Sequence, residues 1–275
     1  EGLEVQVAAR TQELRHANDR LQEQDQQKST FVSNASHELR TPLTSVLGFA
    51  KMVQRIFQRH FLAKAEGDPL LEDKAGLILD NLSIIEQEGR RLTDLLNDLL
   101  DINKIEEGRL EWRDAPVQPA ALLKDAARRA MPRFLGLPGV TLDVRVAPDL
   151  PRLVVDPDRM HQVLFNLLDN AAKFTGPGEV VLSAIGEAGG WVEIRVADRG
   201  PGILEDEREH VFEKFDQTRT TDCGGVKPKG TGLGLAICRQ IVVHYGGSLH
   251  VENGPDGVGA CFVMRLPGEH ARPTS

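Results

Sequence analysis

The sequence predicts two structural units of different class: a long helical hairpin, then an α+β sandwich with helices on one face of a sheet. Two observations predict this division. Through about residue 115 the apolar residues recur every three or four positions, as in amphipathic helices. From about residue 120, helical patterns alternate with short runs of alternating apolar and polar residues, as in half-buried strands. The 275 residues, at roughly 150 per domain, allow about two domains.

The composition excludes several classes of protein. A net charge of -8 gives no long-range attraction to nucleic acid, and 5% aromatic residues leave few platforms for base stacking. The three cysteines (Cys223, Cys238 and Cys261) lack C-x-x-C spacing, which disfavours a zinc site or a disulfide scaffold and fits a reducing compartment. No apolar run reaches the roughly 20 residues that span a bilayer. We therefore expect no nucleic-acid partner and no membrane contact by this segment.

The first segment, residues 1–28, carries a weak heptad pattern. Val7, Leu14 and Leu21 are seven residues apart, but charged and polar residues interrupt the seam. The segment is either a coiled-coil rod that passes a signal or a dimer contact to the next helix, or a solvated helix that frays. The pattern leaves both interpretations open.

The helical unit is predicted as two long helices, residues 29–60 and about 70–107, joined by a turn at 65–69. Each helix carries a wide apolar stripe, and a hairpin cannot bury two wide stripes by itself. Two hairpins paired as a four-helix bundle would bury both, so we expect a homodimer. The stripes consist of Ala35, Leu39, Leu43, Val46, Leu47, Phe49, Ala50, Val53, Ile56 and Phe57 in the first helix, and of Ile78, Leu82, Ile85, Leu92, Leu95, Leu96, Leu99 and Ile102 in the second.

The second unit is predicted to begin after a linker at residues 108–118, where Pro116 and Pro119 mark a change of character. One helix has a clear start signal, since Asp156 can cap it and Pro157 suits its first position. The expected helices are residues 120–134, 157–174 and 231–245, and the expected strands are 140–146, 152–155, 179–185, 191–197, 248–252 and 259–266. Residues 198–230 are expected to be mostly loop, and 267–275 a disordered tail.

The motif Ser36-His37-Glu38-Leu39-Arg40-Thr41-Pro42 lies in the first helix of the hairpin. With Leu39 on the apolar stripe, helical geometry points His37 toward solvent and places Thr41 on the same face. An exposed imidazole is mostly neutral at pH 7, so one ring nitrogen is a free nucleophile. Glu38 can accept a hydrogen bond from the other nitrogen, and Pro42 predicts a bend beside the histidine.

Three further clusters suggest a nucleotide or phosphate ligand, although the first two also have a purely structural explanation. Asn166, Asn170 and Lys173 share one helix face; amide oxygens suit Mg²⁺ and lysine suits phosphate, but a solvated polar face looks the same. Asp198-Arg-Gly200-Pro-Gly202 comes directly after a strand, where the carboxylate could accept from an exocyclic amine such as that of adenine, or simply close a turn.

The third of these clusters, Gly230-Thr231-Gly232-Leu233-Gly234, opens the last predicted helix. Bare glycine amides at a helix N-terminus favour phosphate. The loop before it carries Arg219, Lys227 and Lys229 among small residues, which is the composition of a phosphate-facing lid.

Taken together, the order and content of these clusters resemble the cytoplasmic core of a bacterial two-component sensor histidine kinase. The stretch Phe31 to Leu43 is similar to the phosphoacceptor box of that family, and Asn166 to Thr175 to its asparagine box. Asp198 to Gly202 and Gly230 to Ile237 resemble its two glycine boxes, with a phenylalanine box at Phe212 to Phe215. The resemblance spans about residues 25–266.

The resemblance implies that His37 accepts a phosphoryl group from ATP and passes it to an aspartate of a response regulator. Glu38 would assist as hydrogen-bond acceptor or base, and Thr41 would orient water if the protein also dephosphorylates its regulator. Asn170 would be the main Mg²⁺ ligand. The residues expected at the nucleotide are Asn166, Asn170, Lys173, Asp198, Gly200, Gly202, Phe215, Lys229, Gly230, Thr231, Gly232, Leu233 and Gly234.

The resemblance also implies an architecture: a coiled-coil signalling helix (1–28), a dimerisation and phosphotransfer hairpin (29–112), an ATP-binding sandwich of the gyrase and histidine-kinase type (113–268) and a tail (269–275). It implies a homodimer that meets a receiver domain, receives its signal from an upstream sensor domain and lies in the cytoplasm. Whether the full-length protein is anchored in the inner membrane stays open.

Two alternatives remain. ATP-hydrolysing relatives such as DNA gyrase or mismatch-repair ATPases share the nucleotide fold, but they carry a glutamate where this chain has Asn166, and an amide cannot act as a base for water. A non-catalytic signalling scaffold, or a phosphatase without kinase activity, is the other alternative. The intact set of motif residues disfavours it: His37, Asn170, Asp198, Gly200, Gly202, Gly232 and Gly234.

Overall fold

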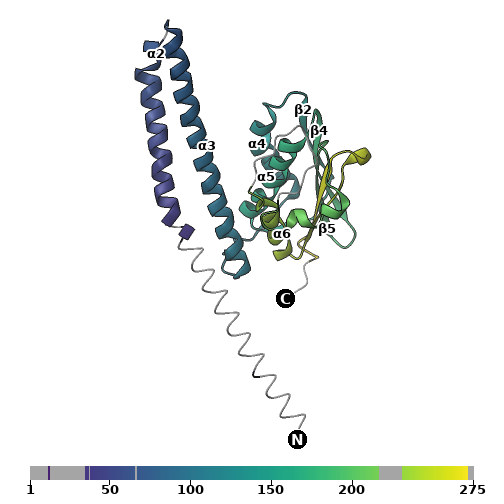
Figure 1. Cartoon of the computed structure of the whole chain (residues 1–275). Helices are drawn as coiled ribbons and strands as arrows, with labels where there is room; N and C mark the ends of the chain where they lie inside the picture. The colour runs from purple at the N-terminus through teal and green to yellow at the C-terminus, as the bar shows by residue number, and fades with distance from the viewer. Residues whose placement is uncertain (1–11, 13–34, 37, 66, 217–230, 272–275) are drawn as a thin grey trace. The chain divides into compact units, whose positions relative to one another are not determined.

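The computed structural model of the chain describes residues 12, 35–36, 38–65, 67–216 and 231–271 (Figure 1). The chain divides into two compact units, Glu1–Asn103 and Lys104–Ser275. The predicted coiled coil at residues 1–28 and the start of the next predicted helix, apart from residue 12, lie outside the described residues. Within the described residues, no helix is both long and apolar enough to cross a membrane.

The first unit is an antiparallel helical hairpin, as predicted. A helix over residues 38–60 continues through Pro42 without a break and is followed by the short α2 (Leu62–Ala65) and the long α3 (Pro69–Glu106). The Arg40 guanidinium donates to Asn97 at 2.9 Å, and Lys51 pairs with Glu86 at 3.5 Å. Residues later in the first helix therefore pair with residues earlier in α3, so the two helices run antiparallel, side by side (Figure 1).

The turn of the hairpin uses a strong helix start signal. The Asp68 carboxylate accepts from the amides of Leu70 and Leu71, and Pro69 takes the first helical position, where no backbone donor is needed. The prediction that the first helix ends at residue 60 missed α2, which adds one more helical turn before the chain reverses.

The hairpin leaves much of its apolar surface uncovered. Phe49 is 66% exposed and Leu77 is 62% exposed, while few apolar residues of α3 are buried. Isolated apolar side chains on a surface are ordinary, but a run along both helices of a hairpin marks an interaction face. The exposed set within the first unit includes Leu39, Val46, Phe49, Met52, Val53, Ile56, Leu70, Leu71, Leu77, Ile78, Ile84, Ile85 and Leu92.

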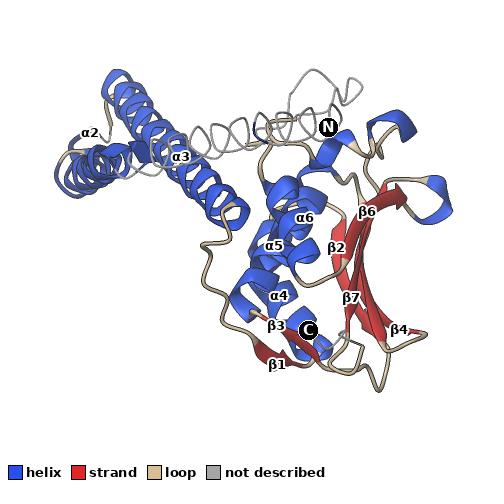
Figure 2. Ribbon diagram, turned by 90° about the horizontal axis from the view of Figure 1, so that it is seen from below, coloured by secondary structure: helices blue, strands red, loops and turns tan. Residues whose placement is uncertain are grey.

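The second unit is the predicted α+β sandwich, and Figure 2 shows its helices gathered on one face of the sheet. The sheet has the strand order β2-β4-β5-β7-β6, with β2 and β4 parallel and the other neighbours antiparallel. Its strands are β2 (Val140–Val146), β4 (Gly178–Glu187), β5 (Trp191–Ala197), β6 (Ser248–Asn253) and β7 (Ala260–Pro267), and its helices are α4 (Pro119–Phe134), α5 (Pro157–Phe174) and α6 (Gly234–His244).

The core of this unit lies between the helices and the sheet. Along α5 the buried residues recur at three- and four-residue steps and face the strands. This stripe consists of Met160, Val163, Leu164, Leu167, Leu168, Ala171 and Ala172. Because the apolar side of α5 is fixed against the sheet, its polar flank is held in one orientation, and this flank carries Asn166 and Asn170.

Several elements differ from the prediction. The predicted linker at 108–118 contains a strand, β1 (Ala115–Val117), which pairs antiparallel with β3 (Leu153–Val155) in a separate two-stranded sheet; Pro116 is tolerated because this strand has one partner. The predicted disordered tail is wrong as far as residue 271. There Gly268 bridges to Leu153, and the Glu269 amide donates to the Arg152 carbonyl at 2.7 Å.

Candidate functional site

The first component of the site is the polar flank of α5. The helix starts as predicted, because Asp156 accepts from the amides of Asp158 and Arg159. Asn166 and Asn170 lie one turn apart on the flank beside the buried stripe, and both are half-buried. The Asn166 side-chain nitrogen donates to the Gly234 carbonyl at 3.3 Å, so the asparagine flank meets the first residue of α6.

Lys173, the third residue predicted on this flank, already has an anionic partner. Its Nζ lies 2.5 Å from the Asp169 carboxylate, which also pairs with Arg133 at 3.2 Å. A phosphate contact by Lys173 would have to compete with this ion pair, so its role at the nucleotide stays a prediction.

The second component is Asp198, at the end of β5. Its carboxylate is only 4% exposed, and Oδ1 accepts from the amides of Gly200 at 2.8 Å and Ala260 at 3.2 Å. Burial raises the pKa of the Asp198 carboxyl, while these two donors act in the opposite direction. Both donors hold Oδ1, which fixes the plane of the carboxylate and suits Oδ2 to a further donor such as an exocyclic amine.

Glycines pack tightly around this aspartate. A Cβ on Gly200 would lie 2.6 Å from the Phe174 carbonyl, and Gly202 has a φ of +77° that favours glycine. Gly254 and Gly259, which were not among the predicted site residues, pack against the backbone carbonyl of Asp198. A Cβ on Gly254 would lie 3.0 Å from this oxygen, and a Cβ on Gly259 would lie 2.0 Å from it. The spacing Gly254-Pro-Asp-Gly-Val-Gly259 was the available signal for a second close-packed turn.

The third component is the glycine turn, Thr231 to Gly234. The prediction that the helix starts at Thr231 is wrong, because Gly232 has a φ of +70° and α6 begins at Gly234. The Phe215 amide donates to the Gly232 carbonyl at 2.9 Å, and a Cβ on Gly232 would lie 2.9 Å from Phe215 Cα. The turn therefore delivers the chain to the N-terminus of α6 with its first amides unpaired by side chains.

The phenylalanines of the predicted phenylalanine box have different surroundings. Phe212 is buried and packs edge-on against Phe262, with ring centroids 6.3 Å apart, so it anchors this segment to the sheet. Phe215 is exposed and has a φ of +64°, which is uncommon for a bulky residue. The predicted lid residues Arg219, Lys227 and Lys229, together with Gly230, lie outside the described residues.

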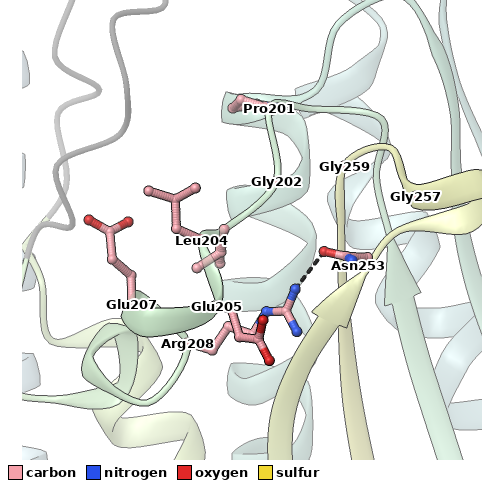
Figure 3. Close-up of a pocket in the computed structure, with 10 residues that line it drawn as sticks. Pro201, Gly202, Leu204, Glu205, Glu207, Arg208, Asn253, Gly257 and Gly259 are labelled. Atoms are coloured by element: carbon pink, nitrogen blue, oxygen red, sulfur yellow. Dashed lines mark hydrogen bonds between the residues drawn. The ribbon is translucent and has the colours of Figure 1, made fainter.

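A hollow of about 230 Å³ adjoins the aspartate turn (Figure 3). Figure 3 shows the Arg208 side chain reaching across it to Asn253, which accepts at 2.6 Å. Gly202 and Gly259 line it, together with Glu205, Glu207 and Arg208.

The hairpin contributes the remaining predicted residues. Glu38 and Thr41 are exposed on the helix over residues 38–60, as their predicted roles toward solvent require, and His37 lies outside the described residues. In the second unit the hydrogen bond from Asn166 to Gly234 joins the asparagine flank to the glycine turn. The arrangement offers amide oxygens, backbone donors at a helix start and a buried acceptor, which together can hold a metal–nucleotide complex.

Comparison with known proteins identifies both units. Residues 155–270 match the family model described as histidine kinase-, DNA gyrase B-, and HSP90-like ATPase, and residues 27–108 match the His kinase A (phospho-acceptor) domain. The chain is 34% identical to the sensor protein TorS of Escherichia coli over 97% of its length, and 34% identical to the circadian input-output histidine kinase CikA of Synechococcus elongatus over 96%. It spans only 28% and 33% of those two relatives.

A solved structure matches most of the chain. The crystal structure of full-length ShkA in complex with AMPPNP matches 88% of this chain and 46% of its own, with 32% identity and a TM-score of 0.68. The fold and site thus define an ATP-binding sandwich that comes after a phosphoacceptor hairpin. The chain belongs to the sensor histidine kinases of two-component systems, whose phosphoacceptor and ATPase domains it contains.

Proposed function

We propose that this chain binds Mg-ATP in its second unit, phosphorylates His37 and passes the phosphoryl group to an aspartate of a response regulator. The observation that carries the proposal is the hydrogen bond between Asn166 and the Gly234 carbonyl. It brings the amide oxygens of α5 and the bare amides of α6 into one site, in a chain that also contains a phosphoacceptor domain.

The residues suit a magnesium ion on the nucleotide. The Asn166 amide nitrogen is engaged with Gly234, which leaves its oxygen as the group available beside Asn170. Asn170 would hold the ion with Asn166 nearby, and amide oxygens are ligands that Mg²⁺ accepts. When bound, the ion would neutralise charge on the phosphates.

The contacts around the site support the remaining roles that we propose. Asp198 would accept from the exocyclic amine of adenine, with Gly200 and Gly202 allowing the ring to approach the backbone. The amides of Gly232 and Gly234 would donate to the phosphates, with Thr231, Leu233 and Phe215 shaping the turn.

In the transfer step a ring nitrogen of His37 attacks the γ-phosphorus, the bond to the bridging oxygen breaks, and ADP leaves. Such a transfer needs positioning and charge stabilisation more than a strong base. Glu38 would accept a hydrogen bond from the other ring nitrogen. The exposed Thr41 would orient water for dephosphorylation of the regulator.

The exposed apolar faces of the hairpin support a homodimer, in which two hairpins form a four-helix bundle. The signal would arrive from a sensor domain upstream of the heptad segment. ATP hydrolysis by itself is disfavoured, because Asn166 occupies the position where the hydrolytic relatives carry a catalytic glutamate.

The test is labelling with radioactive Mg-ATP. We expect a label that is lost in acid and stable in base, and that disappears in His37→Gln. The matched control is His60→Gln, which removes an exposed histidine at the end of the helix over residues 38–60 and should leave the label intact. Label that survives in His37→Gln, or that resists acid, would contradict the proposal.

A further inference from the structure

The carboxylate of Glu106, the last residue of α3, joins two segments that flank the glycine turn. Its Oε1 accepts from Lys214 Nζ at 2.5 Å and from Gln240 Nε2 at 3.1 Å. All three residues belong to the second unit, Lys104–Ser275. Lys214 immediately precedes Phe215, and Gln240 lies in the second turn of α6.

Both partners of Glu106 lead directly to the glycine turn. From Lys214 the next residue is Phe215, whose amide donates to the Gly232 carbonyl at 2.9 Å. From Gln240 the rigid helix α6 leads back to Gly234, which is bonded to Asn166. A single carboxylate oxygen therefore ties together the two segments whose separation sets the shape of the turn.

An exposed ion pair is usually worth little, because two long side chains must be ordered to form it. Here the chain that carries Glu106 is fixed at both ends. Residues 107–114, which we name the connector, are anchored on the far end of α6: Trp112 stacks on His244 with ring centroids 3.7 Å apart, and the Tyr245 hydroxyl donates to Asp114 at 2.9 Å. The helical last turn of α3 holds the near end.

The connector is therefore anchored at the C-terminal end of α6, and Glu106 reaches its partners from the last helical turn of α3. Much of the ordering cost of the pair is met by the stacking and hydrogen bonds at Trp112 and Asp114. Glu106 is not among the residues predicted to contact the nucleotide. Its effect on ATP affinity would therefore pass through Lys214 and Gln240.

We propose that Glu106 is a positioning residue for the glycine turn, through which the helix leaving the phosphoacceptor hairpin influences the affinity for ATP. The inference rests on the proposed function, since it concerns the ATP site of the same chain. It adds a residue outside the nucleotide-binding motifs to the determinants of that site.

The test compares variants of the whole chain by calorimetric ATP binding and by the KM and kcat of autophosphorylation. Glu106→Ala should raise the Kd and KM for ATP roughly two- to fivefold, the scale of a single partly exposed ion pair, with kcat at saturating ATP and the melting temperature unchanged. Lys214→Ala should raise the Kd and KM for ATP by the same factor. The double variant should show no larger rise than either single variant. The matched control is Glu111→Ala, which removes an exposed carboxylate from the connector and should change nothing.

The charge-swapped pair, Glu106→Lys with Lys214→Glu, should restore most of the ATP affinity. Wild-type affinity in Glu106→Ala, additive effects of the two single changes, or no recovery in the swap would overturn the inference. The proposed function is contradicted by a different result, a wild-type chain that binds ATP but does not label His37. In that case the ATP affinities of the Glu106 and Lys214 variants would still decide the role of Glu106.

Discussion

The two units of this chain bury their apolar residues in different ways. On α5 of the second unit Leu168 is fully buried between the helices and the sheet, whereas on α3 of the hairpin Leu77 is 62% exposed. Both are leucines on long helices. The sandwich thus completes its core within one chain, while the hairpin presents an apolar face that a second copy would cover.

This difference separates the tasks of the units. A unit with its own closed core can hold a nucleotide in a fixed frame of backbone and side-chain donors. A hairpin that packs against a second copy, as we propose, would suit changes in helix arrangement, because its contacts would be shared between chains. Substitutions in the two units should therefore differ in the size and the kind of their effects.

The largest difference should come from truncating one leucine in each unit, in two separate variants. Leu168→Ala should lower the free energy of unfolding of the second unit by about 2–5 kcal/mol, because it leaves a cavity in a closed core. Leu77→Ala should cost less than about 0.5 kcal/mol in the monomer and should instead weaken dimerisation. Urea unfolding and sedimentation at several protein concentrations measure both. Equal losses that do not depend on concentration would contradict the contrast between the units.

The next effect concerns the glycine turn. Gly232→Ala should destabilise the second unit by about 1–3 kcal/mol and weaken ATP binding, because the residue has a φ of +70° and its Cβ would press on Phe215. The matched control is Gly136→Ala in the same unit, where a Cβ would meet nothing within 4 Å. Calorimetry measures the ATP affinity of the two variants, and thermal unfolding measures their stability. Equal ATP affinity and stability in Gly232→Ala and Gly136→Ala would show that the turn has no special backbone requirement.

A smaller, pH-dependent effect should arise at Asp198. Burial raises the pKa of this carboxyl in the folded protein, so the folded state binds more protons than the unfolded chain. The ionised group therefore costs stability at neutral pH, and this cost disappears as the pH falls through the raised pKa. Asp198→Asn, which keeps the Oδ1 acceptor for Gly200 and Ala260, should be the more stable protein at pH 7.

The advantage of Asp198→Asn over the wild type should shrink as the pH is lowered. Urea unfolding of both proteins across the acidic range measures the difference, and a difference independent of pH would contradict the shift. The same variant should bind ATP roughly 10- to 100-fold more weakly, because it loses a charged hydrogen-bond acceptor.

The sequence predicted best where local chemistry decides the structure. The Asp156-Pro157 pair defined the start of α5 to the residue, because a cap and a proline act within one turn. The sequence predicted less well where contacts between residues far apart in the chain decide the structure. The tail is ordered as far as residue 271 by bonds to Arg152 and Leu153, which no local pattern reveals.

The candidate site shows the same division. Glycine spacing indicated a phosphate turn, but only the structure shows that Gly232 lies outside the helix and contacts Phe215. Gly254 and Gly259 were missed because their role depends on a close approach to Asp198 from another strand. The link from Glu106 to Lys214 spans 108 residues of sequence and carries no motif.

In the proposed function, the second unit binds ATP and the hairpin carries His37, the residue that would receive the phosphoryl group. Acid-labile labelling and ATP affinity, measured together in His37→Gln and Asn170→Ala, separate the two roles. Both variants should lose the label, but His37→Gln should keep the wild-type affinity for Mg-ATP while Asn170→Ala loses it on the order of 100-fold. Label retained in His37→Gln, or wild-type affinity in Asn170→Ala, would contradict this division.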